Sequence, residues 1–181
     1  MFVLNNEKIL RPGKAWTASN GVKHPGNWSS WSSDLLATYG IVEVAEQTQP
    51  DTQFYHISSI NLDGTWSATA KSMEDVTETI DGIDYVNKGL KSQWTERTNG
   101  TANSLLQTSD WQVIAKAERD RAIDSNVVTY RAAVISKCAT IKAAIADCSD
   151  LDDFKALFVT PVDSDGAATG NAPIHDWPVL G

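Results

Sequence analysis

One pattern constrains the fold of this chain more than any other: large apolar side chains recur every three or four residues between positions 127 and 145. The positions are Val127, Tyr130, Val134, Cys138, Ile141 and Ile145. Side chains at this spacing lie on one face of an α-helix, so the pattern predicts an amphipathic helix of about twenty residues. Ser125 is a suitable N-cap, and residues 147–150 end the helix. Such a helix needs another element to cover its apolar face.

The neighbouring segments extend the helical prediction to residues 85–158. From Tyr85 an apolar stripe passes through Leu90 and Trp94 to Leu106, and the sequence TSDW then interrupts it. Ser149 and Asp152 resemble a capping box before a short helix in LDDFKALF. The long stripe at 127–145 also keeps a seven-residue spacing. It is therefore compatible with a helical bundle between chains, and equally with packing on the β-rich half of the same chain.

The first 71 residues are instead rich in turn signals. Phe2–Leu4 and Ile9–Leu10 flank an Asn-Asn turn, which predicts a hairpin. A helical turn from Ser32 to Tyr39 and a strand at Ile41–Val44 follow, and NLDG between two alternating segments predicts a second hairpin. We therefore expect a β-rich module at 1–71, with residues 72–84 as a linker.

The last segment, residues 159–181, has too few large apolar residues for a core of its own. It holds three prolines and three glycines, and its large apolar residues gather near the end. We expect an extended tail whose Trp177 and Leu180 insert into a neighbouring subunit or partner. Taken together, the segments predict an α+β fold: a small β-rich module of hairpins, then a helical half with an extended C-terminal tail.

Composition limits the partners. The chain has 181 residues with 41% hydrophobic and 21% charged residues, which is enough for a folded core. Its formal charge is −8 and its basic residues are scattered, so we expect no nucleic-acid partner. No signal peptide or membrane-spanning stretch is apparent, so we expect a soluble protein made in the cytoplasm, without membrane insertion. Cys138 and Cys148, about 15 Å apart along one helix, are expected to be reduced and buried.

Motifs of catalysis are missing. His24, His56 and His175 have no metal-ligand spacing, and DSDG at 163–166 lacks the acidic twelfth residue of a calcium loop, where Ile174 stands. No GxSxG, P-loop or GxGxxG sequence occurs. We therefore predict no catalytic residue, no metal and no cofactor, and a protein that is not an enzyme.

Seven tryptophans are unusual for this length. A carbohydrate-binding groove and packing in cores and interfaces are both consistent with them, and their spread along the whole chain favours packing. They are Trp16, Trp28, Trp31, Trp66, Trp94, Trp111 and Trp177.

The sequence TANSLLQTSDWQVIAKAERDRAID followed by VVTYRAAV resembles a segment common in proteins of tailed-bacteriophage tails. There a helix ends in Leu-Leu, a Thr-Asp-Trp-like turn follows, and a second helix opens with Tyr-Arg-Ala-Ala. GVKHPGNWSSWSSDLLATYGIVEV, QPDTQFYHISS and DGTW are similar to the module that often precedes it, so the resemblance covers residues 20–146. Ser109 replaces the commoner Thr, and residues 122–124 replace a frequent Pro-containing linker, which leaves the start of the second helix open.

The segment also makes physical sense as a joint between helices. We expect Trp111 to be buried in the corner, Tyr130 to lie on the packed stripe and Arg131 to reach a carboxylate on a partner chain. The interface or joint residues predicted from the sequence are thus Trp111, Tyr130, Arg131, Trp177 and Leu180.

The resemblance implies a virion structural protein of the phage tail or baseplate, of the fibre or fibre-adaptor type. Its expected partners are other tail or baseplate proteins and, in the assembly, further copies of itself. Its expected location is the virion tail, and the host cytoplasm during assembly. One alternative is a tail fibre assembly chaperone that is not retained in the virion, and a second is a carbohydrate-binding tail protein.

Overall fold

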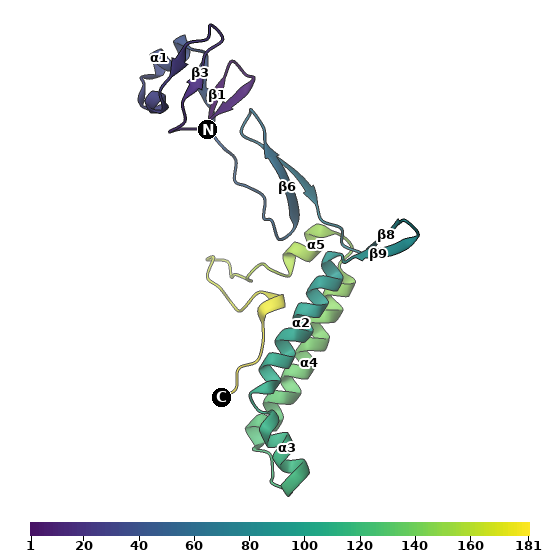
Figure 1. The fold of residues 1–181 in the computed structure, drawn as a ribbon. Helices are drawn as coiled ribbons and strands as arrows, with labels where there is room; N and C mark the ends of the chain where they lie inside the picture. The colour runs from purple at the N-terminus through teal and green to yellow at the C-terminus, as the bar shows by residue number, and fades with distance from the viewer. The chain divides into compact units, whose positions relative to one another are not determined.

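A computed structural model describes all 181 residues and shows an α+β fold (Figure 1). Small antiparallel sheets lie mostly in the first half of the chain, and the second half is helical. The chain divides into two compact units, Met1–Ala70 and Lys71–Gly181. The predicted fold class is confirmed.

The N-terminal unit is built from short strands and two helical turns. Strands β1 (Phe2–Leu4), β2 (Lys8–Leu10) and β5 (Ile41–Glu43) form an antiparallel sheet in the order β2-β1-β5. Between them in sequence lie β3 (Trp16–Thr17) paired with β4 (Lys23–His24), the 3-10 helix η1 (Gly26–Ser30) and helix α1 (Ser33–Thr38). The hairpin of β6 (Tyr55–Ile60) and β7 (Trp66–Ala70) completes the unit.

Local sequence explains the first hairpin and α1. Asn5 and Asn6 have φ of 50° and 55°, the left-handed region that asparagine tolerates best after glycine, so the chain reverses there and Phe2 pairs with Leu10. At α1 the Ser32 hydroxyl accepts a hydrogen bond from the Leu35 amide at 3.3 Å, as an N-cap does. Both predicted elements are confirmed, as is the second hairpin that we expected around NLDG.

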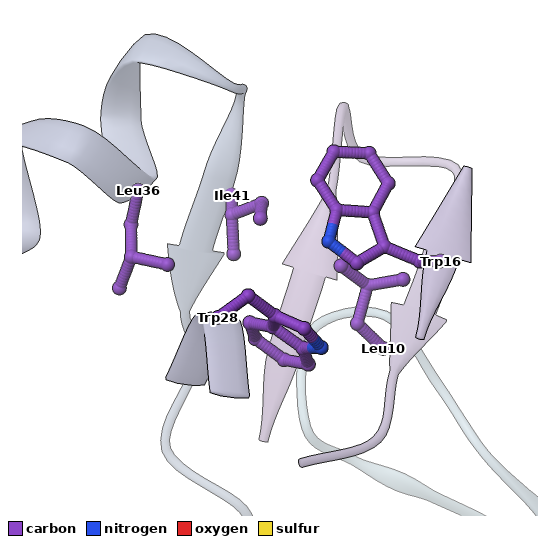
Figure 2. Packing of buried hydrophobic residues seen from close by; sticks show 5 residues of the cluster. All are labelled: Leu10, Trp16, Trp28, Leu36 and Ile41. Carbon is purple, nitrogen blue, oxygen red and sulfur yellow. The ribbon is translucent and has the colours of Figure 1, made fainter. Parts of the chain in front are cut away.

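Aromatic side chains dominate the core of this unit. Its buried cluster consists of Leu10, Trp16, Trp28, Leu36 and Ile41, which converge from strands, η1 and α1 (Figure 2). Trp28 is fully buried, and its indole nitrogen donates to the Lys14 carbonyl at 2.8 Å. A module with so few residues has little volume to bury, and large rings such as those of Trp16 and Trp28 bury much apolar area per residue.

The C-terminal unit is an antiparallel pair of long helices with a hairpin before it (Figure 1). The hairpin is β8 (Val76–Ile80) with β9 (Ile83–Asn87), and the long helices are α2 (Leu90–Gln107) and α4 (Ser125–Asp147). Helix α3 (Asp110–Arg119) forms the corner between them. The short helix α5 (Leu151–Ala156) and the 3-10 helix η2 (Pro173–His175) follow. No helix in the chain is both long enough and apolar enough to cross a membrane.

The stripe that predicted α4 is buried at all six positions. It packs against α2 of the same chain, where Ala102 meets Tyr130, Val134 and Cys138. Neither a bundle between chains nor the β-rich half is needed to cover this part of the stripe. Cys138 and Cys148 are free and buried, as predicted. The N-caps differ from the prediction by one residue each, because Asp124 precedes α4 and Asp150 caps α5.

The structure of residues 72–87 differs from the predicted linker and helix start. The segment expected to be a linker and the start of a helix is the β8–β9 hairpin, and α2 begins only at Leu90. The turn is Asp81-Gly82, with φ of 52° and 78°. Asp-Gly between alternating segments is the same hairpin signal as the one in NLDG, so the local sequence does favour this hairpin.

Candidate functional site

The corner between α2, α3 and α4 contains two residues predicted to form a joint, Trp111 and Arg131. Arg131 Nη1 lies 2.8 Å from each of three oxygens: the Leu106 carbonyl, the Ser109 hydroxyl and the Asp110 carboxylate. The guanidinium therefore ties the start of α4 to the end of α2 and the start of α3. We expected this side chain to reach a carboxylate on a partner chain. That expectation is wrong in the free chain, because its own Asp110 provides the carboxylate.

A second polar link closes the same corner. Gln112 Nε2 donates to the Asp124 carboxylate at 2.9 Å, and the Asp124 amide donates to Gln112 Oε1 at 2.9 Å. Gln112 and Ser109 are buried. Sequence reasoning missed both, because a glutamine or serine in a helical segment looks like a surface residue until its partner is known. The geometry of the corner is thus set by polar contacts.

Trp111 does not fill the corner, which contradicts the prediction. It is 52% exposed, and the guanidinium of Arg121 lies 5.4 Å from the centre of its ring. Helix α3 turns Gln112 and Ala115 inward, which leaves Trp111 and Ile114 on the outer side. The polar links of Gln112 and Arg131 fix this rotation. We call Trp111, Ile114 and Arg121 the α3 face.

Tyr130 is buried on the α4 stripe, as expected. The C-terminal tail beside it differs from the prediction of an extended segment that docks on another subunit. Trp177 packs on the cluster around Tyr130 in its own unit, together with Leu105 and Leu106, so part of its ring is already covered by its own chain. Asp176 pairs with Lys137 at 2.5 Å, and Ile174 is buried. Leu180 remains 42% exposed. Ala172 and Ile174 are thus buried in the unit's own core and Trp177 is partly buried, whereas residues 159–171 and 179–181 are exposed.

The β8–β9 hairpin carries an exposed apolar surface. Every residue of both strands is exposed. The register pairs Val76 with Asn87, Glu78 with Tyr85 and Ile80 with Ile83, and side chains alternate between the two sides of a strand. One side therefore holds four large apolar residues around a single carboxylate. We call this set the hairpin face: Val76, Glu78, Ile80, Ile83 and Tyr85.

The base of the hairpin is held firmly to the start of α2. The Gly89 amide donates to the Asp75 carboxylate at 2.8 Å, and the Leu90 amide donates to the Ser72 carbonyl at 2.9 Å. The hydrogen bond from the Gly89 amide, together with one from the Ser92 side chain, holds the pKa of the Asp75 carboxyl below its usual value. A side chain at position 89 would meet the Glu74 backbone at 2.4 Å, so glycine is required there. The hairpin face thus has a defined direction relative to α2.

The remaining polar and aromatic groups do not converge on a reaction site. His24 lies among Trp16, Trp31 and Tyr39 in the N-terminal unit, His56 lies on β6, and His175 lies near Phe158 in the C-terminal unit. No three His, Cys, Asp or Glu side chains lie close enough to hold a metal ion. A hollow of about 350 Å³ in the N-terminal unit is lined mainly by apolar residues with Arg11 and Glu46, and Glu46 already pairs with the Met1 ammonium at 3.2 Å.

Comparison with known proteins adds no relative: no family model, curated protein or solved structure matches this chain. Its function must therefore be inferred from its own geometry. Its distinctive surfaces are the hairpin face and the α3 face, where large exposed apolar side chains lie beside charged ones. Exposed apolar surfaces of this kind are found at contact sites between proteins, among other places.

Proposed function

We propose that this chain is a structural protein of a phage tail or baseplate, of the fibre or fibre-adaptor type, that acts through protein–protein contacts. The observation that carries the proposal is the hairpin face. An isolated two-stranded hairpin is marginally stable in water, and this one displays four large apolar side chains on one side. A surface of this kind is costly in a free monomer and becomes favourable when a partner covers it.

The rest of the chain supports the same proposal. The resemblance of residues 20–146 to phage tail proteins supplies the biological setting, and the polar links of Arg131 and Gln112 make the helical unit a firm support for its two faces. A firm support lowers the ordering cost of assembly, because its surfaces need not be organised when the partner binds. This role requires no catalytic group or cofactor.

Quantitative mass spectrometry of purified virions tests the proposal. Peptides of this chain should be recovered in a fixed ratio to known tail proteins, from particles of the phage that encodes it. Recovery from infected lysate together with absence from particles would contradict a structural role and support the assembly chaperone instead.

The carbohydrate-binding alternative is less favoured by the positions of the tryptophans. Trp16 and Trp28 are committed to the core of the N-terminal unit, and Trp111 lies in the other unit. Stacking platforms for sugars need several exposed rings close together. Specific signal on a glycan array that is lost when Trp31 is replaced by Ala would revive this alternative.

A further inference from the structure

The hairpin face has a carboxylate among its apolar residues, and the α3 face has a guanidinium over its tryptophan ring. Glu78 lies among the apolar residues of the hairpin face and has no ion-pair partner. Arg121 lies over Trp111 on the α3 face and has no carboxylate partner either. An unpaired carboxylate amid apolar groups and an unpaired guanidinium amid apolar groups are complementary surfaces.

The two faces of one chain cannot meet each other. The hairpin precedes the first residue of α2, and α3 follows its last residue. Helix α2 has 18 residues, which corresponds to a length of about 27 Å at 1.5 Å per residue. Firm contacts hold the elements at both ends of α2: Asp75 and Gly89 at one end, Arg131 and Ser109 at the other. Neither face can therefore be covered by the other face of the same chain.

We propose that the partner is a second copy of this chain, whose α3 face docks on the hairpin face with Arg121 beside Glu78. In this contact Trp111 and Ile114 of one copy would cover the apolar residues around Glu78 of the next. The inference shares with the proposed function the premise that the hairpin is a contact surface. It does not depend on the phage setting, because it concerns the purified chain alone.

Charge disfavours the symmetrical arrangements. Residues 74–87 hold five carboxylates and no Lys or Arg, so two hairpins placed together would repel each other. Residues 116–121 hold three basic and two acidic side chains, so two α3 faces placed together would bring like net charges together. The head-to-tail arrangement instead pairs the acidic hairpin with a segment of net positive charge. Contacts of that type form a closed ring when the rotation between copies permits it, and an open filament otherwise.

A single contact of this size should be weak. The two faces supply a handful of large side chains, whereas a stable interface usually buries about 800 Å² per partner. We therefore expect an association that depends on protein concentration and weakens with added salt, since it relies on an ion pair at a partly exposed position.

Sedimentation velocity of the full chain over a concentration series, with two charge-reversal variants, tests this proposal. The wild type should gain mass as concentration rises. Glu78→Arg alone and Arg121→Glu alone should each raise the dissociation constant about tenfold or more, because each places like charges in the contact. A one-to-one mixture of the two variants should recover association, since contacts that join Glu78 of one variant to Arg121 of the other again pair opposite charges. Glu7→Arg, in the exposed β1–β2 turn, is the matched control and should behave as the wild type.

Circular dichroism of each variant verifies that it folds, and Glu78→Gln with Arg121→Gln replaces any reversal variant that does not. These smaller changes should also weaken association. A wild type that stays monomeric at its highest soluble concentration overturns the inference. So does association that Arg121→Glu leaves unchanged, or a mixture that fails to recover. Absence of the chain from virions would refute the proposed function without affecting this result.

Discussion

Trp28 and Trp111 both lie in short helical segments, one in each unit, and their surroundings differ completely. Trp28 is fully buried among aliphatic and aromatic side chains, with its indole nitrogen bonded to the Lys14 carbonyl. Trp111 is on the surface, while Arg131, Gln112 and their partners hold the corner beneath it. Trp28 is thus part of the core of the small N-terminal unit. Trp111 lies on the surface of the C-terminal unit, where polar contacts hold the corner.

The largest effect should follow from removing the buried ring. Trp28→Ala should lower the free energy of unfolding of the N-terminal unit by about 3–5 kcal/mol, because it loses apolar burial and leaves a cavity. Urea unfolding followed by circular dichroism measures this change. A loss no larger than that of a surface substitution would mean that the ring is not the centre of this core.

Deleting residues 172–181 should have the next largest effect. The deletion removes the buried Ala172 and Ile174 and uncovers the cluster that Trp177 covers, so we expect the free energy of unfolding to fall by about 2–4 kcal/mol. Thermal unfolding of the truncated chain checks this. An unchanged melting temperature would return the tail to the role of an anchor for another subunit, which the sequence alone suggested.

The polar corner should be sensitive to Arg131. Arg131→Ala leaves the Leu106 carbonyl, the Ser109 hydroxyl and the Asp110 carboxylate without this donor, at a cost of about 1–3 kcal/mol. Arg131→Lys is the matched control, since it keeps the charge and loses the planar fork, and it should recover part of the stability. Chemical unfolding of both variants provides the comparison, and equal stability of Arg131→Ala and wild type would show that the corner is held by other contacts.

Trp111→Ala should cost little stability, about 0.5 kcal/mol or less, because the ring is largely in water. Trp111→Ala and Trp28→Ala each remove an indole, one from the surface and one from a core, so their losses of stability can be compared directly. Unfolding midpoints measured side by side should differ widely. A large loss in Trp111→Ala would show that the indole is packed in the corner after all.

The smallest effect concerns pH at another polar turn. Hydrogen bonds from the Ser149 hydroxyl and amide to the Asp153 carboxylate hold the pKa of Asp153 below its usual value. The carboxylate therefore favours the folded state above its unfolded pKa, and this contribution is lost as the pH falls through the lower folded pKa. Asp153→Asn should reduce the pH dependence of stability in acid. An unchanged profile would contradict a role for this carboxylate in the turn.

Elements whose sequence pattern is compatible with only one structure could be predicted from the sequence. The stripe of α4 predicts its buried face at all six positions, because a three-four spacing of large apolar residues over this length is rarely found outside a helix. The Asn5-Asn6 turn is equally direct. The β8–β9 hairpin was predictable from Asp81-Gly82, but the apolar residues near Tyr85 were interpreted with a helical period that begins only at Leu90.

The corner could not be predicted in the same way. Burial of Trp111 is a reasonable expectation from its size, and only the contacts of Gln112 with Asp124 and of Arg131 with Ser109 reverse it. Those contacts join residues far apart in sequence, and polar residues give no periodic signal. The exposed faces were missed for the same reason, because exposure depends on what the rest of the chain covers.

Hydrogen–deuterium exchange of the wild type, dilute and concentrated, is the most direct test of the claim that the chain works through its two exposed faces. Amides of residues 76–87 and 110–121 should gain protection on concentration, while those of residues 127–145 should be equally protected throughout. The Glu78→Arg variant should show no such gain. Exchange in these two segments that does not change with concentration would contradict this claim.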